Sequence, residues 1–304
     1  MTGLVECVPN VSEGRDRTAV DALAAAIRAA PGVTLMNVHA DPDHHRSVFS
    51  FLGPPDTIEA AALALAARVV ELLDMRLHRG LHPRVGALDV LPFVPLRGCS
   101  MDDAVALARR VGRAIGGRHA LPIWYYGAAA MRPGRETPRP LRRGGYEGLA
   151  ARLATPEGAP DDGPARFDAR SGAVLVGARG ILVAFNVWLA TEDVDAARAI
   201  ARAVRESSGG LPAVQAMGVL LASRRLAQVS MNLLDYRRTP IPAVFDRVLE
   251  EARRYRVAVS RSELVGVAPR AALAGRAPES VGLPDLPPDL CLDTYLRTDP
   301  HLPA

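Results

Sequence analysis

Residues 33–52, VTLMNVHADPDHHRSVFSFL, consist of two apolar, β-branched runs separated by the polar segment ADPDHHR. This pattern predicts two strands, 33–38 and 47–52, joined by a turn. Segments with the apolar spacing of amphipathic helices lie on both sides of the pair, and further apolar runs lie outside them. In chain order, these neighbours are strand 4–8, helix 17–29, helix 57–73, strand 86–94, helix 101–115 and strand 122–125. The order around the hairpin is therefore β-α-β-β-α-β, followed by one further helix and strand.

The second half of the chain repeats this order. Its expected elements are strand 181–189, helix 194–206, strands 214–221 and 227–233, helix 242–255, strand 257–260 and a helix from residue 269. The repetition predicts an α/β fold class of the α+β sandwich kind, with two related subdomains, each a split β-α-β-β-α-β sheet with helices on one face. We expect an N-terminal subdomain at 1–180, a C-terminal subdomain at 181–304 and a ligand groove between them.

A long connection, residues 127–172, precedes the second half and is rich in proline, glycine and arginine. Connections of this length inside a compact domain are usually functional or disordered. We interpret this one as an ordered, substrate-covering loop that belongs to the N-terminal subdomain.

The composition restricts the chemistry. All 37 basic residues are arginine, so a Schiff-base lysine and a phosphate-binding loop with a Gly-Lys pair are both excluded. Arginine binds carboxylates in a bidentate fork, which favours a small substrate with several carboxylates. The arginines are dispersed among acidic residues and aromatic residues make up only 5%, which argues against a nucleic-acid partner.

The three cysteines lie far apart, at positions 7, 99 and 291, a pattern typical of a reducing compartment and without zinc-site spacing. No apolar run is long enough to span a membrane, and the N-terminus lacks the pattern of a secretory signal. We therefore expect a cytoplasmic enzyme with no membrane partner and no metal.

His82, in the stretch HRGLHPRVGALDVLPF, is the first candidate for chemistry. Imidazole titrates near pH ~6.5 and can take and return a proton at neutral pH. Pro83 disfavours helix at the preceding residue, so His82 is expected on a turn that enters a strand. The alternative is an ordinary surface histidine in a loop.

Two further segments could contact a ligand. The first is the cluster His39, Asp41, Asp43, His44 and His45, which fits a polar turn, a substrate contact or, least well, a metal site. The second is VECVPNVSEG, residues 5–14, where Asn10 and Glu13 lie between a strand and a helix. Free backbone N–H groups at such a position bind ligands, although Ser12 also fits a simple helix N-cap. Neither a G-x-S-x-G elbow nor a G-x-G-x-x-G turn is present.

Several long motifs together resemble glutamate formimidoyltransferase, the transferase part of formimidoyltransferase-cyclodeaminase. They cover roughly residues 4–273 in the same order; the cyclodeaminase part is absent. The matching stretches are LVECVPNVSEG, DPDHHRSVFSFLG, DMRLHRGLHPRVGALDVLPFVPLRG, YGAAA, APDDGP, GARGILVAFNVWL, QVSMNLLDY and SELVGVAP.

The resemblance implies a dimeric protein of two α/β subdomains with a folate site in the groove between them. It implies that His82 is the catalytic histidine and that Gly163, Pro164, Phe167 and Gly172 contact the folate. The family often has Asp at the position of His39 and Asn at that of His45, which leaves the role of the turn cluster open.

The expected reaction moves a formimidoyl group from N-formimidoyl-L-glutamate to N5 of tetrahydrofolate, a co-substrate, with no metal. Arg46 and Arg84 are the candidates that grip the glutamate carboxylates, and Glu6 or Asp89 could orient the cationic amidine. Three alternatives stay open: glutamate formyltransfer with 5-formyltetrahydrofolate, a folate-binding protein without turnover, and a metal-dependent hydrolase built on the turn cluster. The assembly expected from the resemblance is a homodimer.

Overall fold

The computed structural model describes residues 3–284 and 286–297. The ends of the predicted subdomains, residues 1–2 and 298–304, and residue 285 lie outside the described residues. The chain divides into two compact units, Met1–Arg179 and Gly180–Ala304. None of the described helices has the length and apolar character needed to cross a membrane.

The first unit is built on one sheet with the strand order β3-β4-β1/β2-β5-β7-β6. Its strands are β1 (Val5–Cys7), β2 (Asn10–Val11), β3 (Thr34–Asp41), β4 (Arg46–Gly53), β5 (Leu88–Pro95), β6 (Ile123–Gly127) and β7 (Val174–Ala178). The pairs from β3 to β5 are antiparallel, whereas β7 pairs in parallel with both β5 and β6. The predicted hairpin at 33–52 is confirmed as β3 and β4, the first of them extended to the turn.

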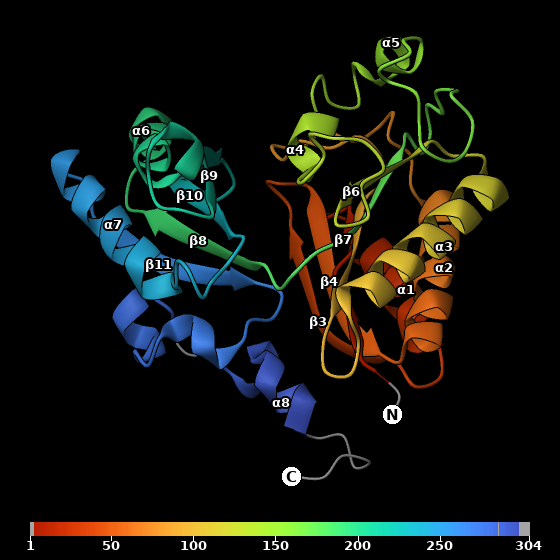
Figure 1. Cartoon of the computed structure of the whole chain (residues 1–304). Coiled ribbons are helices and arrows are strands. Elements are labelled where there is room, and N and C mark those ends of the chain that lie inside the picture. The colour runs from red at the N-terminus through yellow and green to blue at the C-terminus, as the bar shows by residue number, and fades with distance from the viewer. Residues whose placement is uncertain (1–2, 285, 298–304) are drawn as a thin grey trace. The chain divides into compact units, whose positions relative to one another are not determined.

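Three helices cover one face of this sheet (Figure 1): α1 (Arg17–Arg28), α2 (Pro55–Leu72) and α3 (Met101–His119). Asp16, and not the Ser12 considered from the sequence, caps α1, while Ser100 forms a capping box with Asp103 at α3. Alternate strand residues such as Phe49 and Phe51 are fully buried against the helices and form the main core. Helix α3 runs four residues beyond the predicted end at Ile115.

The opposite face of the sheet is covered in part by residues 127–172, which contain the short helices α4 (Pro138–Leu141) and α5 (Leu149–Leu153). Leu141 and Leu149 pack there on Trp124 and Tyr126 of β6, which alternate with the core-facing Ile123. This part of the segment therefore packs on the sheet. Strand β7 was not expected: it is short, buried on both faces and follows directly on this segment.

The second unit has the sheet order β11-β8-β10-β9, all antiparallel, and its helices α6 and α7 contact each other. The elements are β8 (Val183–Leu189), α6 (Val194–Val204), η1 (Glu206–Ser208), β9 (Val214–Leu221), β10 (Leu226–Leu233), α7 (Ile241–Arg254), β11 (Val259–Val265), η2 (Arg270–Leu273), η3 (Pro278–Val281), η4 (Pro288–Leu290) and α8 (Leu292–Arg297).

The second unit repeats the strand order of part of the first. With β1 and β2 counted as one strand, β1/β2 lies between β4 and β5 and β3 pairs with β4, just as β8 lies between β10 and β11 and β9 pairs with β10; β6 and β7 are additional to the first unit. This confirms the predicted repetition of the split β-α-β-β-α-β order and the mixed α/β fold class. The helix expected from residue 269 is instead a single 3₁₀ turn, η2, which ends at Ala274 in the left-handed region.

Candidate active site at one edge of the first sheet

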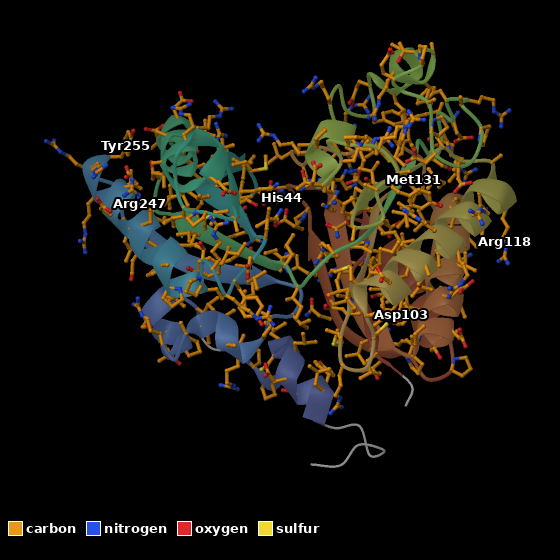
Figure 2. All side chains as sticks on the ribbon, viewed as in Figure 1. His44, Asp103, Arg118, Met131, Arg247 and Tyr255 are labelled. Atoms are coloured by element: carbon orange, nitrogen blue, oxygen red, sulfur yellow. The ribbon has the colours of Figure 1, made fainter. Side chains whose placement is uncertain are left out.

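The candidate residues of the first unit gather along one edge of its sheet, the edge that is formed by the ends of the strands and not by an outermost strand. Strand β2 ends there, and β4, β5 and β7 begin there, because β2 runs antiparallel to β4 and β5 while β7 runs parallel to β5. The loops before β4, β5 and β7 therefore meet, although they are far apart in the sequence. Figure 2 shows His44 at the end of the β3–β4 hairpin.

Asp89 is the centre of this edge. It lies at a β-bulge in β5, where Asn10 pairs with Val90 but Val11 pairs with Leu88, and bulges commonly re-aim side chains next to active sites. Its carboxylate is fully buried and accepts hydrogen bonds from Arg46 Nη1 at 2.8 Å, from the backbone N–H of Val85 at 2.8 Å and from Arg142 Nη2.

The charge on Asp89 is held in place by its partners. Burial alone would raise the pKa of this carboxyl, but the charges and hydrogen bonds of Arg142 and Arg46 hold it below its usual value. Arg46 is itself buried, which lowers its pKa to about 10 despite the attraction of Asp89. Its Nε–H also donates to Asn10 Oδ1 at 2.9 Å. Asn10, Arg46 and Asp89 are thus one connected group.

His82 lies in the loop that enters β5, as expected, and its ring is partly exposed. Its Nδ1 lies 2.7 Å from the carbonyl oxygen of Pro83, which can only accept, so Nδ1 carries the proton. Nε2 is then the basic atom of the neutral ring. Desolvation, the charges of Arg46 and Arg142, and His44 hold the pKa of His82 well below its usual value, so the ring is neutral at pH 7.

The turn between β3 and β4 supports the loop that carries His82. The backbone N–H of Leu81 donates to Asp43 O at 3.3 Å. Gly80 lies so close to the backbone of His44 that a Cβ added to it would be 2.3 Å from His44 O. The rings of His44 and His82 lie 6.1 Å apart. No group of three or more potential metal ligands occurs among the described residues. The turn is thus in direct contact with the loop that carries His82.

Two stacked histidines join the turn to the loop. The rings of His45 and His78 are 4.2 Å apart at 12°. His45 Nδ1 lies 2.9 Å from Arg79 O, and its Nε2 lies 3.2 Å from Glu13 Oε1. Glu13 Oε1 also accepts three backbone N–H groups of residues 14–16. Although desolvation opposes it, the His45 hydrogen bond and these N–H groups lower the pKa of Glu13 to about 2. Glu13 therefore anchors both the start of α1 and the turn.

His78 is a neutral partner in this stack. Its Nδ1 accepts from Arg84 Nε at 3.1 Å and its Nε2 donates to His45 O at 2.8 Å, which fixes the tautomer. Burial lowers its pKa to about 4. Arg84 also forms a two-pronged ion pair with Glu147, at 2.7 and 2.9 Å. Arg84 thus connects the loop to residues 127–172.

The predicted folate-contacting residues separate into two places. Gly172 lies beside the His82 loop, because it bridges Gly86 and its φ of 71° places the missing Cβ 2.3 Å from Val85 O. Phe167 packs on Tyr146, with ring centroids 5.5 Å apart. Gly163 instead packs against Leu121 O at the start of β6, where only a glycine fits, and Pro164 follows it.

Some residues of this edge were not among the sequence candidates. Arg142, Tyr146 and Glu147 all come from the long connection, and no short motif marks them. Glu6, considered for the amidine, is buried on β1, which raises its pKa to about 7 against the charge of Arg179. Its neighbours Val5 and Cys7 face the core, so Glu6 faces the other side of the sheet.

Comparisons with known proteins cover both units. Residues 4–179 match the formiminotransferase domain, N-terminal subdomain, and residues 184–278 match the formiminotransferase domain. The glutamate formimidoyltransferase of Streptococcus pyogenes serotype M1 is 40% identical over 273 residues, which cover 90% of this chain and 91% of that protein. The protein of the same name from Thermoplasma acidophilum is 41% identical over 272 residues and is covered to 89%, as is this chain.

A longer relative is also similar. The formimidoyltransferase-cyclodeaminase of Rattus norvegicus is 42% identical over 283 residues, which cover 91% of this chain but 52% of that protein. The chain therefore spans about half the length of this relative. Among solved structures, the periplasmic protease PqqL of Escherichia coli aligns with a TM-score of 0.19 at 8% identity over 83% of this chain and 34% of its own, too low to support an argument.

Proposed function

The chain belongs to the formiminotransferase family, and we propose on that basis that it transfers the formimidoyl group of N-formimidoyl-L-glutamate to N5 of tetrahydrofolate. The products are 5-formimidoyltetrahydrofolate and L-glutamate. The observation that carries the proposal is the match of both units to the two formiminotransferase subdomains, together with relatives of that activity that align along nearly their whole length.

His82 is proposed as the group that moves the proton. The lone pair of N5 attacks the formimidoyl carbon, and His82 Nε2 takes the proton that N5 releases. The imidazolium then gives this proton to the glutamate nitrogen as its bond to the formimidoyl carbon breaks. The hydrogen bond from Nδ1 to Pro83 O supports this role, because it leaves Nε2 as the acceptor. Proton transfer of this kind contributes about 10²–10⁴-fold, and holding two substrates together contributes more.

The other predicted residues are proposed to bind the two substrates. Asn10, Glu13, Arg46 and Arg84 belong to the network around Asp89 and His78, close to the His82 loop. Folate contacts are proposed for the segment that contains Gly163, Pro164, Phe167 and Gly172. Tetrahydrofolate is itself the acceptor, so the proposed chemistry needs no metal or prosthetic group.

The setting of the enzyme is also a proposal. We propose a cytoplasmic homodimer with small-molecule substrates and no nucleic-acid or membrane partner, in a pathway that degrades histidine. The spread of arginines among acidic residues and the three free cysteines support it.

The test is direct turnover by the purified full chain. We expect rapid loss of formimidoylglutamate with tetrahydrofolate as acceptor, monitored by the absorbance of the folate product. Transfer between 5-formyltetrahydrofolate and glutamate should be much slower. Preference for the formyl pair would replace this proposal by glutamate formyltransfer. Tight folate binding with no product from either pair would point to a binding protein instead.

A further inference from the structure

The Arg46–Asp89–Arg142 cluster carries an unbalanced positive charge. Both guanidinium groups donate to the one carboxylate, and the side chains of Arg46 and Asp89 are 7% and 0% exposed. With Asp89 ionised, two cations face one anion in a place that is largely shielded from water. A charge that lacks a counter-ion in such a place is costly, and an anion that enters it is strongly held.

Arg142 has donors left over for such an anion. A guanidinium has five N–H groups. Nη2 of Arg142 donates to Asp89, while its Nε is buried without a hydrogen-bond partner in the part of the chain that the structure describes. The side chain keeps 16% exposure, so part of it is open to a ligand although Nε itself is not. Arg46, by comparison, also binds Asn10.

We propose that Arg142, together with Arg46, forms the subsite that binds the α-carboxylate of the reacting amino acid. The proposal rests on the transfer proposed above and adds a residue from the long connection to it. The α-carboxylate is bonded to the carbon that bears the reacting nitrogen, so it must lie close to the proton-transfer group. Folate also ends in glutamyl carboxylates, but the whole aminobenzoyl unit separates these from N5. The amino acid is therefore the source that the position favours.

The subsite couples binding to proton transfer. The groups that act most strongly on the His82 ring are Arg46 from β4, Arg142 from the end of α4, His44 from the turn and the carbonyl oxygen of Pro83. Burial and the two arginine charges lower the pKa of His82 and make the free ring a weak base. A bound carboxylate offsets these charges, so the ring becomes more basic when the donor arrives.

The experiment compares Arg142→Gln with Arg143→Gln, an exposed arginine next in sequence. Loss of a charge-assisted hydrogen bond to a ligand predicts a KM for formimidoylglutamate raised about 10- to 100-fold in Arg142→Gln, with the KM for tetrahydrofolate and the Arg143→Gln enzyme unchanged. Binding of L-glutamate alone, by calorimetry, should weaken by a similar factor. This second readout remains valid if the transfer proposal itself fails.

Substrates that lack one carboxylate identify the source. N-formimidoyl-4-aminobutyrate has no α-carboxylate, so Arg142→Gln should cause no further loss with this donor. Tetrahydropteroate lacks the glutamyl tail, and with it the penalty of Arg142→Gln should remain in full. If Arg142→Gln still raises the donor KM with N-formimidoyl-4-aminobutyrate, or no longer raises it with tetrahydropteroate, the proposal is overturned.

The pH profile separates ligand binding from a merely structural role. Removal of a positive charge beside His82 raises its pKa, so the acid limb of kcat/KM should move to higher pH in Arg142→Gln. If this variant unfolds more easily, Arg142→Lys keeps the charge but loses the fork, and should show a smaller rise in KM with the acid limb unmoved. Unchanged donor KM, glutamate binding and acid limb in a folded Arg142→Gln would refute the subsite.

Discussion

Replacement of Asp89 by Asn removes the one negative charge between Arg46 and Arg142. The carboxylate is fully buried and accepts from both arginines and from Val85 N–H. In Asp89→Asn, an NH₂ group replaces one carboxylate oxygen, so an N–H donor faces a guanidinium. The two buried guanidinium cations then repel each other without an anion between them. Loss of one partner from a buried charge group costs about 3–5 kcal/mol.

The expected change in unfolding is large enough to measure. For a unit of the size of Met1–Arg179, each kcal/mol moves the midpoint by about 2–4 °C, so a loss of about 3–5 kcal/mol predicts a fall of about 6–20 °C. Urea unfolding followed by tryptophan fluorescence and circular dichroism gives the same free energy. The control is Asp21→Asn on the exposed side of α1, where the change should stay within about 0.5 kcal/mol.

The sign of the pH dependence follows from the lowered pKa of Asp89. Because the folded pKa lies below the unfolded value of about 3.9, the ionised carboxylate stabilises the fold above that value. This stabilisation is lost as the pH falls through the folded pKa. The difference between the wild type and Asp89→Asn should therefore shrink below about pH 4. An Asp89→Asn protein as stable as the Asp21→Asn control at pH 7 would refute the reasoning.

Three further substitutions test other contacts. Gly172→Ala places a Cβ at a φ of 71° and 2.3 Å from Val85 O, so it should lower the free energy of urea unfolding by at least about 1–3 kcal/mol. The control is Gly117→Ala, where the added Cβ meets open space in α3 and should stabilise the fold by up to about 1 kcal/mol. Equal effects of the two changes would contradict the close approach of Gly172 to Val85. The pKa of His78 is lowered to about 4, so the unfolded chain takes up the proton first as the pH falls. The free energy of unfolding should therefore decrease between about pH 6.5 and pH 4, by about 3 kcal/mol at most. His78→Asn should flatten this dependence of the unfolding free energy on pH, and an unchanged dependence would contradict the role of His78. Glu147 is 64% exposed on its side chain, so Glu147→Gln should cost less than about 1 kcal/mol and less still in high salt; a loss of several kcal/mol would show that its pair with Arg84 is far stronger than the exposure implies.

The sequence was sufficient for the repeated topology because each repeat has its own local signals. Residues 33–52 show two strands around a polar turn, and the apolar spacing alone places the starts of α1 and α3 at the observed residues, Arg17 and Met101. Strand β7 was not predicted because its parallel partners β5 and β6 are distant in the sequence and no hairpin turn connects it to either of them. The 3₁₀ turn at η2 shows that a helical start signal after Pro269 does not determine length.

The site was predicted in part for a similar reason. His82 follows from one recognisable stretch, and its place in the loop that enters β5 was predicted. Arg142 lies 53 residues from its partner Asp89, and such a pairing follows only from the meeting of strand ends at the sheet edge. The polar turn favoured for the His39–His45 cluster is present between β3 and β4, and within it His45 lies in hydrogen-bond distance of the carbonyl of Arg79 and the carboxylate of Glu13. Residue types alone could not show that these histidines face each other.

The most direct measurement of the central claim is single-turnover formimidoyl transfer by His82→Gln with both substrates bound. The account predicts a rate about 10²–10⁴-fold below that of the wild type, with the dissociation constant of tetrahydrofolate nearly unchanged. A His82→Gln enzyme that transfers the group at the wild-type rate would contradict the assignment of Nε2 as the atom that carries the proton.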